Sequence, residues 1–226
     1  DLIADGCYDC VVEGGPGAQG LNGWIFALLA LDAGGYQAPE GAQYTRETII
    51  EAIVSAQGED GGFSLTGDAL DADITAMALQ ALAPYADGQA EVIDRALAAL
   101  SAAQCTDGGF ASWGAENAES TAQVVMALCA LGIDPAADER FCKEGGSAVS
   151  ALLGFRGEDG SFAHVGGTSD AMASEQGLQA LEALRRFYAG EKRFFDMTDA
   201  GAPVQWTADS AAAEETAGVP AAVYMA

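Results

Sequence analysis

The side chains best suited to chemistry lie in one acidic stretch of this 226-residue sequence, where Asp68, Asp71 and Asp73 precede an apolar run. Grouped carboxylates are the ligands that calcium prefers, but the ordered D-x-D-x-D-G pattern of a calcium loop is missing. An Asp at the start of a helix also accepts hydrogen bonds from the first free N–H groups. We favour helix capping by Asp71 or Asp73, because the cap-like residues Glu119 and Ser120 stand at a corresponding place later in the chain.

Thiol and metal chemistry have weaker support. The chain has five cysteines, an odd number that leaves at least one thiol unpaired: Cys7, Cys10, Cys105, Cys129 and Cys142. Cys7 and Cys10 form a single CxxC, which fits a redox pair, half a metal site or two unrelated thiols. With His164 as the only histidine, a four-ligand zinc site is not expected. We therefore expect no metal and no other cofactor.

Five further side chains are candidates for contacting a ligand: Trp24, Tyr85, Trp113, Glu119 and His164. Aromatic residues in apolar helices are more often ordinary core, and a histidine in a glycine-bearing loop is more often a plain loop residue. The chain also lacks the phosphate-binding GxxxxGK[ST] pattern and the GxSxG pattern of serine hydrolases. The sequence therefore offers candidates for binding and no complete catalytic set.

The charge excludes several classes of partner. With 34 acidic residues against 9 basic ones, the formal net charge is −25. Nucleic acids and anionic lipid surfaces both require a basic face, so neither is an expected partner. No apolar run is long enough to span a bilayer. Because the chain begins at Asp1 without a signal peptide, we expect a mature fragment or an excised domain.

A repeated turn organises the sequence. The segment QGEDGGF at 57–63 returns as QCTDGGF at 104–110 and as RGEDGSF at 156–162, and each copy precedes an acidic or polar loop and an apolar helix. Self-similarity at this period indicates an array of one supersecondary unit. We expect the aromatic residues that end the turns, Phe63, Phe110 and Phe162, to lie wedged between neighbouring helices.

Two kinds of helix alternate between these turns. Helices that are apolar nearly all round are predicted at 22–33, 74–82, 120–131 and 171–187, and one-sided helices at 45–57, 90–103 and 147–155. A helix that is apolar all round must be surrounded, whereas a one-sided helix covers the outside. We therefore expect an inner and an outer layer, with the inner N-termini at one mouth and with Leu79, Leu128 and Leu178 buried.

These residues resemble a known family. The pattern Q-x3-G-x-F, at 57–63 and 104–110, is similar to the repeat of squalene cyclases and protein prenyltransferase β-subunits; the third copy departs, with Arg156 in place of Gln. The stretches DADITAMALQALAPY and FFDMTDA are more similar to bacterial surface proteins described as prenyltransferase/squalene oxidase repeat proteins. The resemblance implies an all-α fold, the α/α toroid shared with the cobalamin carriers intrinsic factor and transcobalamin, over residues 19–199. It also implies a secreted or cell-surface location.

The enzymes of this fold supply a test. Class II terpene cyclases protonate an alkene with the middle acid of a D-x-D-D-T-A motif, and residues 71–76 read DADITA, with Ile74 in place of the last aspartate. In this comparison Asp73 would be the general acid, beside Asp71. The prenyltransferases need an Asp/Cys/His zinc site, which has no match. An apolar cavity with Asp73 at its end would favour an enzyme.

The resemblance thus favours a non-catalytic binding or scaffold module, with a small ligand at the toroid mouth and a corrinoid as one candidate. A terpenoid-cyclase-like enzyme using Asp73 is the alternative. Residues 1–18 are expected to form an N-terminal edge segment, with a short helix around Val11 and Val12, and residues 200–226 a tail or linker. Because only four inner helices are present, we expect an incomplete ring that exposes some of Trp24, Ile25 and Leu28. Residues 1–18, upstream repeats or a second subunit would then cover this edge.

Overall fold

The computed structural model of the chain describes residues 2–67 and 69–200. These residues are mostly helical, as predicted for an all-α fold, and two short hairpins interrupt the helices: β1 (Ala111–Ser112) with β2 (Ala115–Glu116), and β3 (Cys142–Lys143) with β4 (Gly146–Ser147). The α-helices are α1 Leu21–Ala33, α2 Arg46–Ser55, α3 Ala72–Leu82, α4 Ala90–Ala103, α5 Ala118–Ala130, α6 Ala148–Gly154 and α7 Ala171–Ala189. The predicted tail, 200–226, lies outside the described residues from 201 onward.

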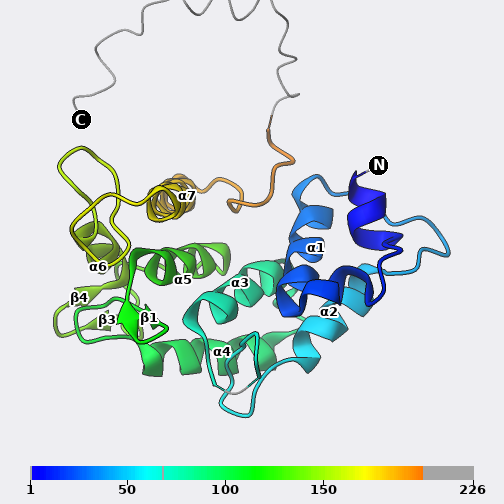
Figure 1. The fold of residues 1–226 in the computed structure, drawn as a ribbon, viewed down its shortest axis with the longest axis horizontal. Coiled ribbons are helices and arrows are strands. Elements are labelled where there is room, and N and C mark those ends of the chain that lie inside the picture. The colour runs from blue at the N-terminus through cyan, green and yellow to red at the C-terminus, as the bar shows by residue number, and fades with distance from the viewer. Residues whose placement is uncertain (1, 68, 201–226) are drawn as a thin grey trace, which may run out of the picture.

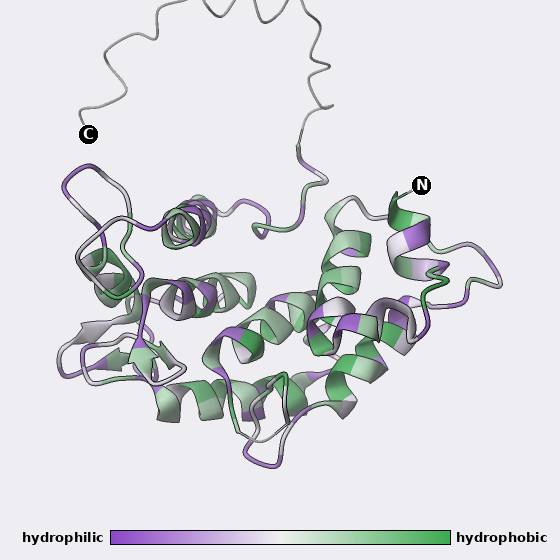
Figure 2. Ribbon diagram, in the orientation of Figure 1, coloured by the Kyte–Doolittle hydropathy of each residue, from purple (hydrophilic) through white to green (hydrophobic). Residues whose placement is uncertain are grey.

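The helices form two layers. Helix α5 packs between α3 and α7, and α1 lies against α3. Helices α2, α4 and α6 pack on the outside, against α1, α3 and α5 in turn, so that the inner helices follow an arc with α1 and α7 at its ends (Figure 1). Hydrophilic residues gather in the loops that join the layers (Figure 2). Every predicted helix from residue 22 onward is therefore present, with ends that differ by a few residues.

The repeated turn has a repeated set of hydrogen bonds, which the second copy illustrates. The amide Nε2 of Gln104 donates to the carbonyls of Gly108, at 2.8 Å, and Phe141, at 2.9 Å. Asp107 Oδ1 accepts from the N–H of Gly109, at 3.1 Å. Gly108 has a φ of 100°, which only glycine adopts without strain. In this corner the glutamine of the motif is the hydrogen-bond donor and the aspartate is the acceptor. The glycine adopts the left-handed conformation that reverses the backbone.

The aromatic that ends each turn is clamped to the following inner helix. The N–H of Phe110 donates to Thr121 Oγ1, and the N–H of Asn117, the residue before α5, donates back to the Phe110 carbonyl; both distances are 3.1 Å. The other two copies make the same contacts, with Phe63 held by Thr75 and Phe162 held by Ser174. The three rings are at most 2% exposed, which confirms the predicted wedges.

One of the three core leucines does not lie where the layer prediction places it. Leu79 and Leu128 are fully buried, as predicted, but Leu178 is 67% exposed, so that prediction is wrong. Helix α7 turns small residues toward its neighbours: Gly177 meets the ring of Phe162, and Ala180 is buried. Leu178 follows Gly177 by about 100° around the helix, on a side that no described helix covers.

The N-terminal edge is covered in part by its own chain, while Phe26 on α1 stays exposed. Exposure is expected from the sequence for some of Trp24, Ile25 and Leu28; Ile25 and Leu28 are fully buried, and only Trp24 stays partly exposed. Trp24 is half-buried, because Gly17 lies against its indole and Tyr44 meets it edge-on at 5.6 Å. The predicted covers for α1 are residues 1–18, upstream repeats or a second subunit. In the structure residues 2–19 pack on α1.

The predicted helix around Val11 and Val12 is wrong, because both residues lie outside any helix, in an exposed connection. Short helical segments lie on either side instead, a π-helix at Ala4–Tyr8 and a 3-10 helix at Gly15–Gln19. Gly14, with a φ of 88°, separates Val12 from the second segment in a left-handed conformation.

The segment after α7 crosses back to the other end of the arc. We call residues 191–200 the strap. The N–H of Met197 donates to the carbonyl of Ala33 at the end of α1, at 2.8 Å, and Arg186 on α7 lies 3.6 Å from Asp199. Figure 1 shows the strap in orange between α7 and α1. The strap thereby joins the first and last inner helices through a few contacts.

Candidate functional site

The predicted acids lie at the N-terminal end of the inner helices, where α3, α5 and the β1–β2 hairpin meet. Asp71 is the residue before α3, and its Oδ1 accepts from the N–H groups of Asp73, at 2.9 Å, and Ile74, at 3.2 Å. Asp71 is therefore a helix cap, as predicted. The equivalent cap of α5 is Asn117, whose Oδ1 accepts from Ser120 N at 2.8 Å. Glu119 and Ser120, taken as cap-like from the sequence, lie inside the helix.

Asp73 has a different environment from Asp71. It is the second residue of α3, and its Oδ1 is buried without a hydrogen bond of normal geometry. Burial raises the pKa of Asp73, the nearby hydroxyls of Ser120 and Ser112 oppose that rise, and the negative charges of Asp71 and Glu119 add to it. A carboxyl in such a setting holds its proton to a higher pH than usual.

Two more of the predicted side chains meet beside Asp73. His164 Nδ1 lies 2.8 Å from Glu119 Oε2, and the backbone carbonyl of His164 accepts from the N–H of Ala118, at 2.9 Å. The Glu119 side chain is 12% exposed and that of His164 is 53% exposed. The structure therefore brings Asp71, Asp73, Glu119 and His164 together at one end of the helices.

Trp113 projects from the tip of the hairpin at the same end. It is 92% exposed and has a φ of 55°, a left-handed conformation that is strained for a residue other than glycine. Gly114 follows with a φ of 84°, so the two form the type I′ turn that joins paired strands most tightly. A bulky aromatic in a strained, solvent-facing turn position is a candidate contact residue.

The remaining two predicted ligand residues lie elsewhere. Trp24 packs on Gly17 and Tyr44, as described above. The Tyr85 hydroxyl donates to both oxygens of Asp32, at 2.8 and 2.9 Å, on the opposite side of the layer. Arg46 also donates to Asp32, at 2.7 Å, and to the carbonyl of Leu31 at the end of α1, at 2.9 Å. Burial of the Tyr85 hydroxyl is the main cause that raises the pKa of Tyr85, and its hydrogen bond to Asp32 is the next.

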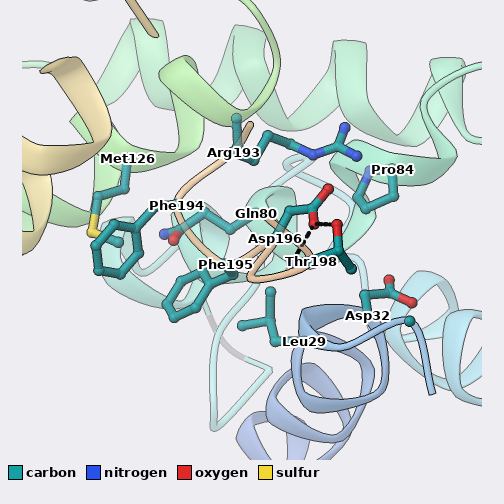
Figure 3. A pocket seen from close by; sticks show the side chains of 12 residues that line it. Leu29, Asp32, Gln80, Pro84, Met126, Arg193, Phe194, Phe195, Asp196 and Thr198 are labelled. Carbon is teal, nitrogen blue, oxygen red and sulfur yellow. Dashed lines mark hydrogen bonds between the residues drawn. The ribbon is translucent and has the colours of Figure 1, made fainter. Parts of the chain in front are cut away.

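A cavity of about 280 Å³ lies between the inner helices and the strap (Figure 3). Helices α1, α3 and α5 supply residues from their C-terminal halves, and the strap supplies two aromatic side chains. The cavity is lined by Leu29, Asp32, Gly35, Gln80, Pro84, Met126, Ala130, Arg193, Phe194, Phe195, Asp196 and Thr198. An apolar cavity with a few polar groups is the usual form of a small-molecule site.

A ladder of glutamines crosses the inner layer and ends at this cavity. Gln80 Nε2 donates to Gln123 Oε1 at 2.8 Å, and Gln123 Nε2 donates to Gln176 Oε1 at 3.0 Å. The ladder joins α3, α5 and α7 through side chains that are otherwise hard to satisfy in an inner layer. Gln80 is 4% exposed and is the only one of the three that lines the cavity.

The strap holds its aromatic residues over the cavity. Phe194 and Phe195 meet edge to face, with ring centroids 5.0 Å apart. Asp196 accepts from the N–H of Thr198, at 3.1 Å, and from its hydroxyl, at 2.5 Å, which fixes the turn that follows (Figure 3). Lys192 lies 3.6 Å from Asp196. These contacts are within the strap, and the Met197–Ala33 hydrogen bond fastens it to α1.

Sequence reasoning missed the cavity residues. The adjacent phenylalanines in FFDMTDA, amid charged residues, are the signal that could have indicated them, since two large aromatics in a polar segment need a surface to cover. In the described ranges, no group of three His, Cys, Asp or Glu side chains is arranged to hold a metal ion, and no helix is long and apolar enough to cross a membrane. The comparison with protein-family models finds no match, and the comparison with curated proteins finds none either.

Proposed function

We propose that this chain is a non-catalytic binding module of a secreted or cell-surface protein, built as an incomplete α/α toroid, which holds a small and largely apolar ligand under the strap. The observation that carries the proposal is the cavity of about 280 Å³ between the inner helices and Phe194 and Phe195. Its lining is mostly aliphatic and aromatic, so a ligand would gain affinity from the apolar surface that it buries there.

The toroid in this proposal is supported by the repeated corners and by the alternation of inner and outer helices. Three copies of the turn place three inner helices in the same orientation, and the strap returns toward α1. The location in the proposal rests on the sequence resemblance alone.

The scaffold role concerns the N-terminal edge. An apolar groove along α1 is lined by Leu2, Val12 and Phe26, and Phe26 is 51% exposed. The proposal therefore includes a further segment of the parent chain, or a second subunit, that packs on this groove. Exposed apolar surface of this kind is typical of interaction sites.

The enzyme alternative has less support. A cyclase-like reaction needs the acid at the end of the apolar cavity, and Asp73 does not line it. Gln80, the α3 residue that does, lies seven positions further along the helix, about 10 Å away. The buried carboxyl of Asp73 is thus separated from the space in which an alkene would lie.

The size of the cavity narrows the choice of ligand. About 280 Å³ is at the low end of the range for drug-sized ligands. A corrinoid is several times larger, so it would need the strap to move away. A compact molecule fits the space between the helices and the strap.

A thermal-shift screen tests the proposal, with small aromatics, fatty acids, polyprenyl diphosphates and corrinoids as ligands. A ligand that binds only the native state raises the Tm. Ala130→Phe fills the cavity and should abolish the shift, whereas Ala102→Phe, at an exposed position on the outer helix α4, should leave it intact. A screen without any stabilising ligand, or a shift that survives Ala130→Phe, would contradict the proposal.

A further inference from the structure

We propose that the strap is the lid of the cavity: it opens as one unit about Gly190, and the ion pair between Arg186 and Asp199 is its latch. The proposal rests on the proposed binding function and adds the route by which a ligand enters and leaves. A site that lies between helices and a covering segment exchanges its contents when that segment moves. The contacts of the strap identify the part that moves and the contacts that hold it.

The centre of the strap is held together by its own hydrogen bonds. Asp196 accepts from the hydroxyl of Thr198, at 2.5 Å, and from its N–H, at 3.1 Å. The N–H of Asp196 donates in turn to the carbonyl of Arg193, at 2.9 Å. These bonds span the turn that carries the two phenylalanines, so the strap keeps its shape when its contacts with the helices break.

The strap has fewer polar contacts with the helices than within itself. Beyond Glu191, two such contacts are present among the described residues. The N–H of Met197 donates to the carbonyl of Ala33 at the end of α1, at 2.8 Å, and Asp199 Oδ2 lies 3.6 Å from Arg186 Nη1 on α7. Segments with few contacts to the core open at a lower free energy than the whole domain. The strap therefore has the features of a unit that opens locally.

The joint between α7 and the strap is Gly190. It ends the helix in the left-handed conformation, with a φ of 66°. No atom lies within 4 Å of the place that a side chain would occupy there, so the backbone has room to turn. Residues at the end of a helix commonly absorb the change in backbone dihedrals when a neighbouring segment moves. We therefore place the hinge at this glycine.

The latch is engaged only in part. The Nε of Arg186 donates to Glu182 Oε1, at 3.1 Å, but its Nη1 is buried without a hydrogen bond. Asp199 stands opposite this nitrogen at 3.6 Å, beyond the distance of a charge-assisted hydrogen bond. A buried donor without an acceptor is costly, and a shift of the strap by roughly 1 Å toward α7 would supply the acceptor. The strap is thus positioned to close further on the cavity.

Hydrogen exchange of single amides tests the lid without any ligand. Selective labelling of methionine with ¹⁵N gives one signal in the strap, Met197, and one in the middle of α5, Met126, whose side chain is 2% exposed. The amide of Met197 should be protected at least about tenfold less than that of Met126. Low concentrations of urea should speed exchange at Met126 more than at Met197, because local opening exposes little surface.

Matched variants assign the latch. Asp199→Asn removes the charge that faces Arg186 and should lower the protection of the Met197 amide by about two- to fivefold, as expected for a partly exposed ion pair. Protection at Met126 should stay the same. Asp138→Asn is the control, because it breaks the ion pair with Arg140, away from the strap, and should leave Met197 unchanged.

Stopped-flow fluorescence tests the lid during entry of a ligand. The probe is N-phenyl-1-naphthylamine, a neutral aromatic compound that becomes fluorescent in apolar surroundings. Its binding rate should level off at high probe concentration, because entry then waits for the strap to open. Asp199→Asn should raise this limiting rate by about the same factor as it lowers protection at Met197, and Ala130→Phe should abolish the signal.

The outcomes separate the lid from the binding function. If Met197 and Met126 exchange alike, or if Asp199→Asn changes Met197 no more than Asp138→Asn does, the lid proposal is wrong, whether or not a ligand binds. The same holds if the probe is blocked by Ala130→Phe but binds at a rate that Asp199→Asn does not change. If the strap opens as predicted while neither the probe nor the screen gives a ligand blocked by Ala130→Phe, the binding function fails and the movement stands.

Discussion

Phe110→Ala should be among the most damaging single changes in this protein. The ring is fully buried, and the backbone on both sides of it is bonded to the start of α5 through Thr121 and Asn117. Removing a buried phenylalanine ring leaves a cavity that the surrounding helices fill only in part, at a cost of about 3–5 kcal/mol. For a domain of this size about 1 kcal/mol lowers the Tm by roughly 2–4 °C, so we expect a drop of roughly 6–20 °C.

Urea unfolding followed by far-UV circular dichroism measures this cost. The matched control is Phe26→Ala, at a position that is 51% exposed, which should cost clearly less. Phe63→Ala, in the first copy of the turn, should resemble Phe110→Ala, because that ring is 1% exposed and similarly clamped. A cost below about 1 kcal/mol for Phe110→Ala would refute the account of the turn as a fixed corner between helices.

Two further predictions concern the same turn. Burial and the adjacent Asp107 raise the pKa of Glu116 to about 7 from its ordinary 4.5, so the folded chain binds this proton more tightly and loses stability as pH rises between those values. Glu116→Gln should therefore be more stable than the unaltered chain at pH 8 by on the order of 1 kcal/mol after solvent screening, and equally stable at pH 4, as melting curves at both pH values would show. Gln104→Leu leaves the carbonyls of Gly108 and Phe141 without their donor and should lower the free energy of unfolding by about 2–4 kcal/mol, measured by urea titration; a loss below about 0.5 kcal/mol would show that water replaces the amide.

Sequence reasoning succeeded where the same physical need recurs. The repetition of the turn predicted a recurring corner with Phe110 and its two counterparts buried between helices, whereas the hydrogen bonds of Gln104 and Asp107 became known only from the structure. Asp71 followed from the general need of a helix N-terminus for an acceptor. The positions of the helices followed from their apolar patterns, with the N-terminal segment as the exception.

Sequence reasoning failed where a contact depends on the position of a helix in the row of inner helices rather than on the residue itself. Leu178 has the pattern of a core residue, but it belongs to the last inner helix, and no described helix packs on that side. Trp24 and Tyr85 have partners, Gly17 and Asp32, in segments whose approach no local pattern specifies. The cavity under the strap depends on a reversal of the chain after α7, and the hydrophobic periodicity of the sequence does not predict that reversal.

The direct test of the central claim is methyl NMR of the methionines while the chain is titrated with the ligands that raise its Tm. Met126 lines the cavity, whereas Met77 and Met172 do not. The account predicts that the Met126 methyl resonance shifts as ligand is added, until the site is saturated. The methyl resonances of Met77 and Met172 should not shift, and Ala130→Phe should abolish the shift at Met126. Larger shifts at Met77 or Met172 than at Met126 would contradict the claim that the ligand lies under the strap.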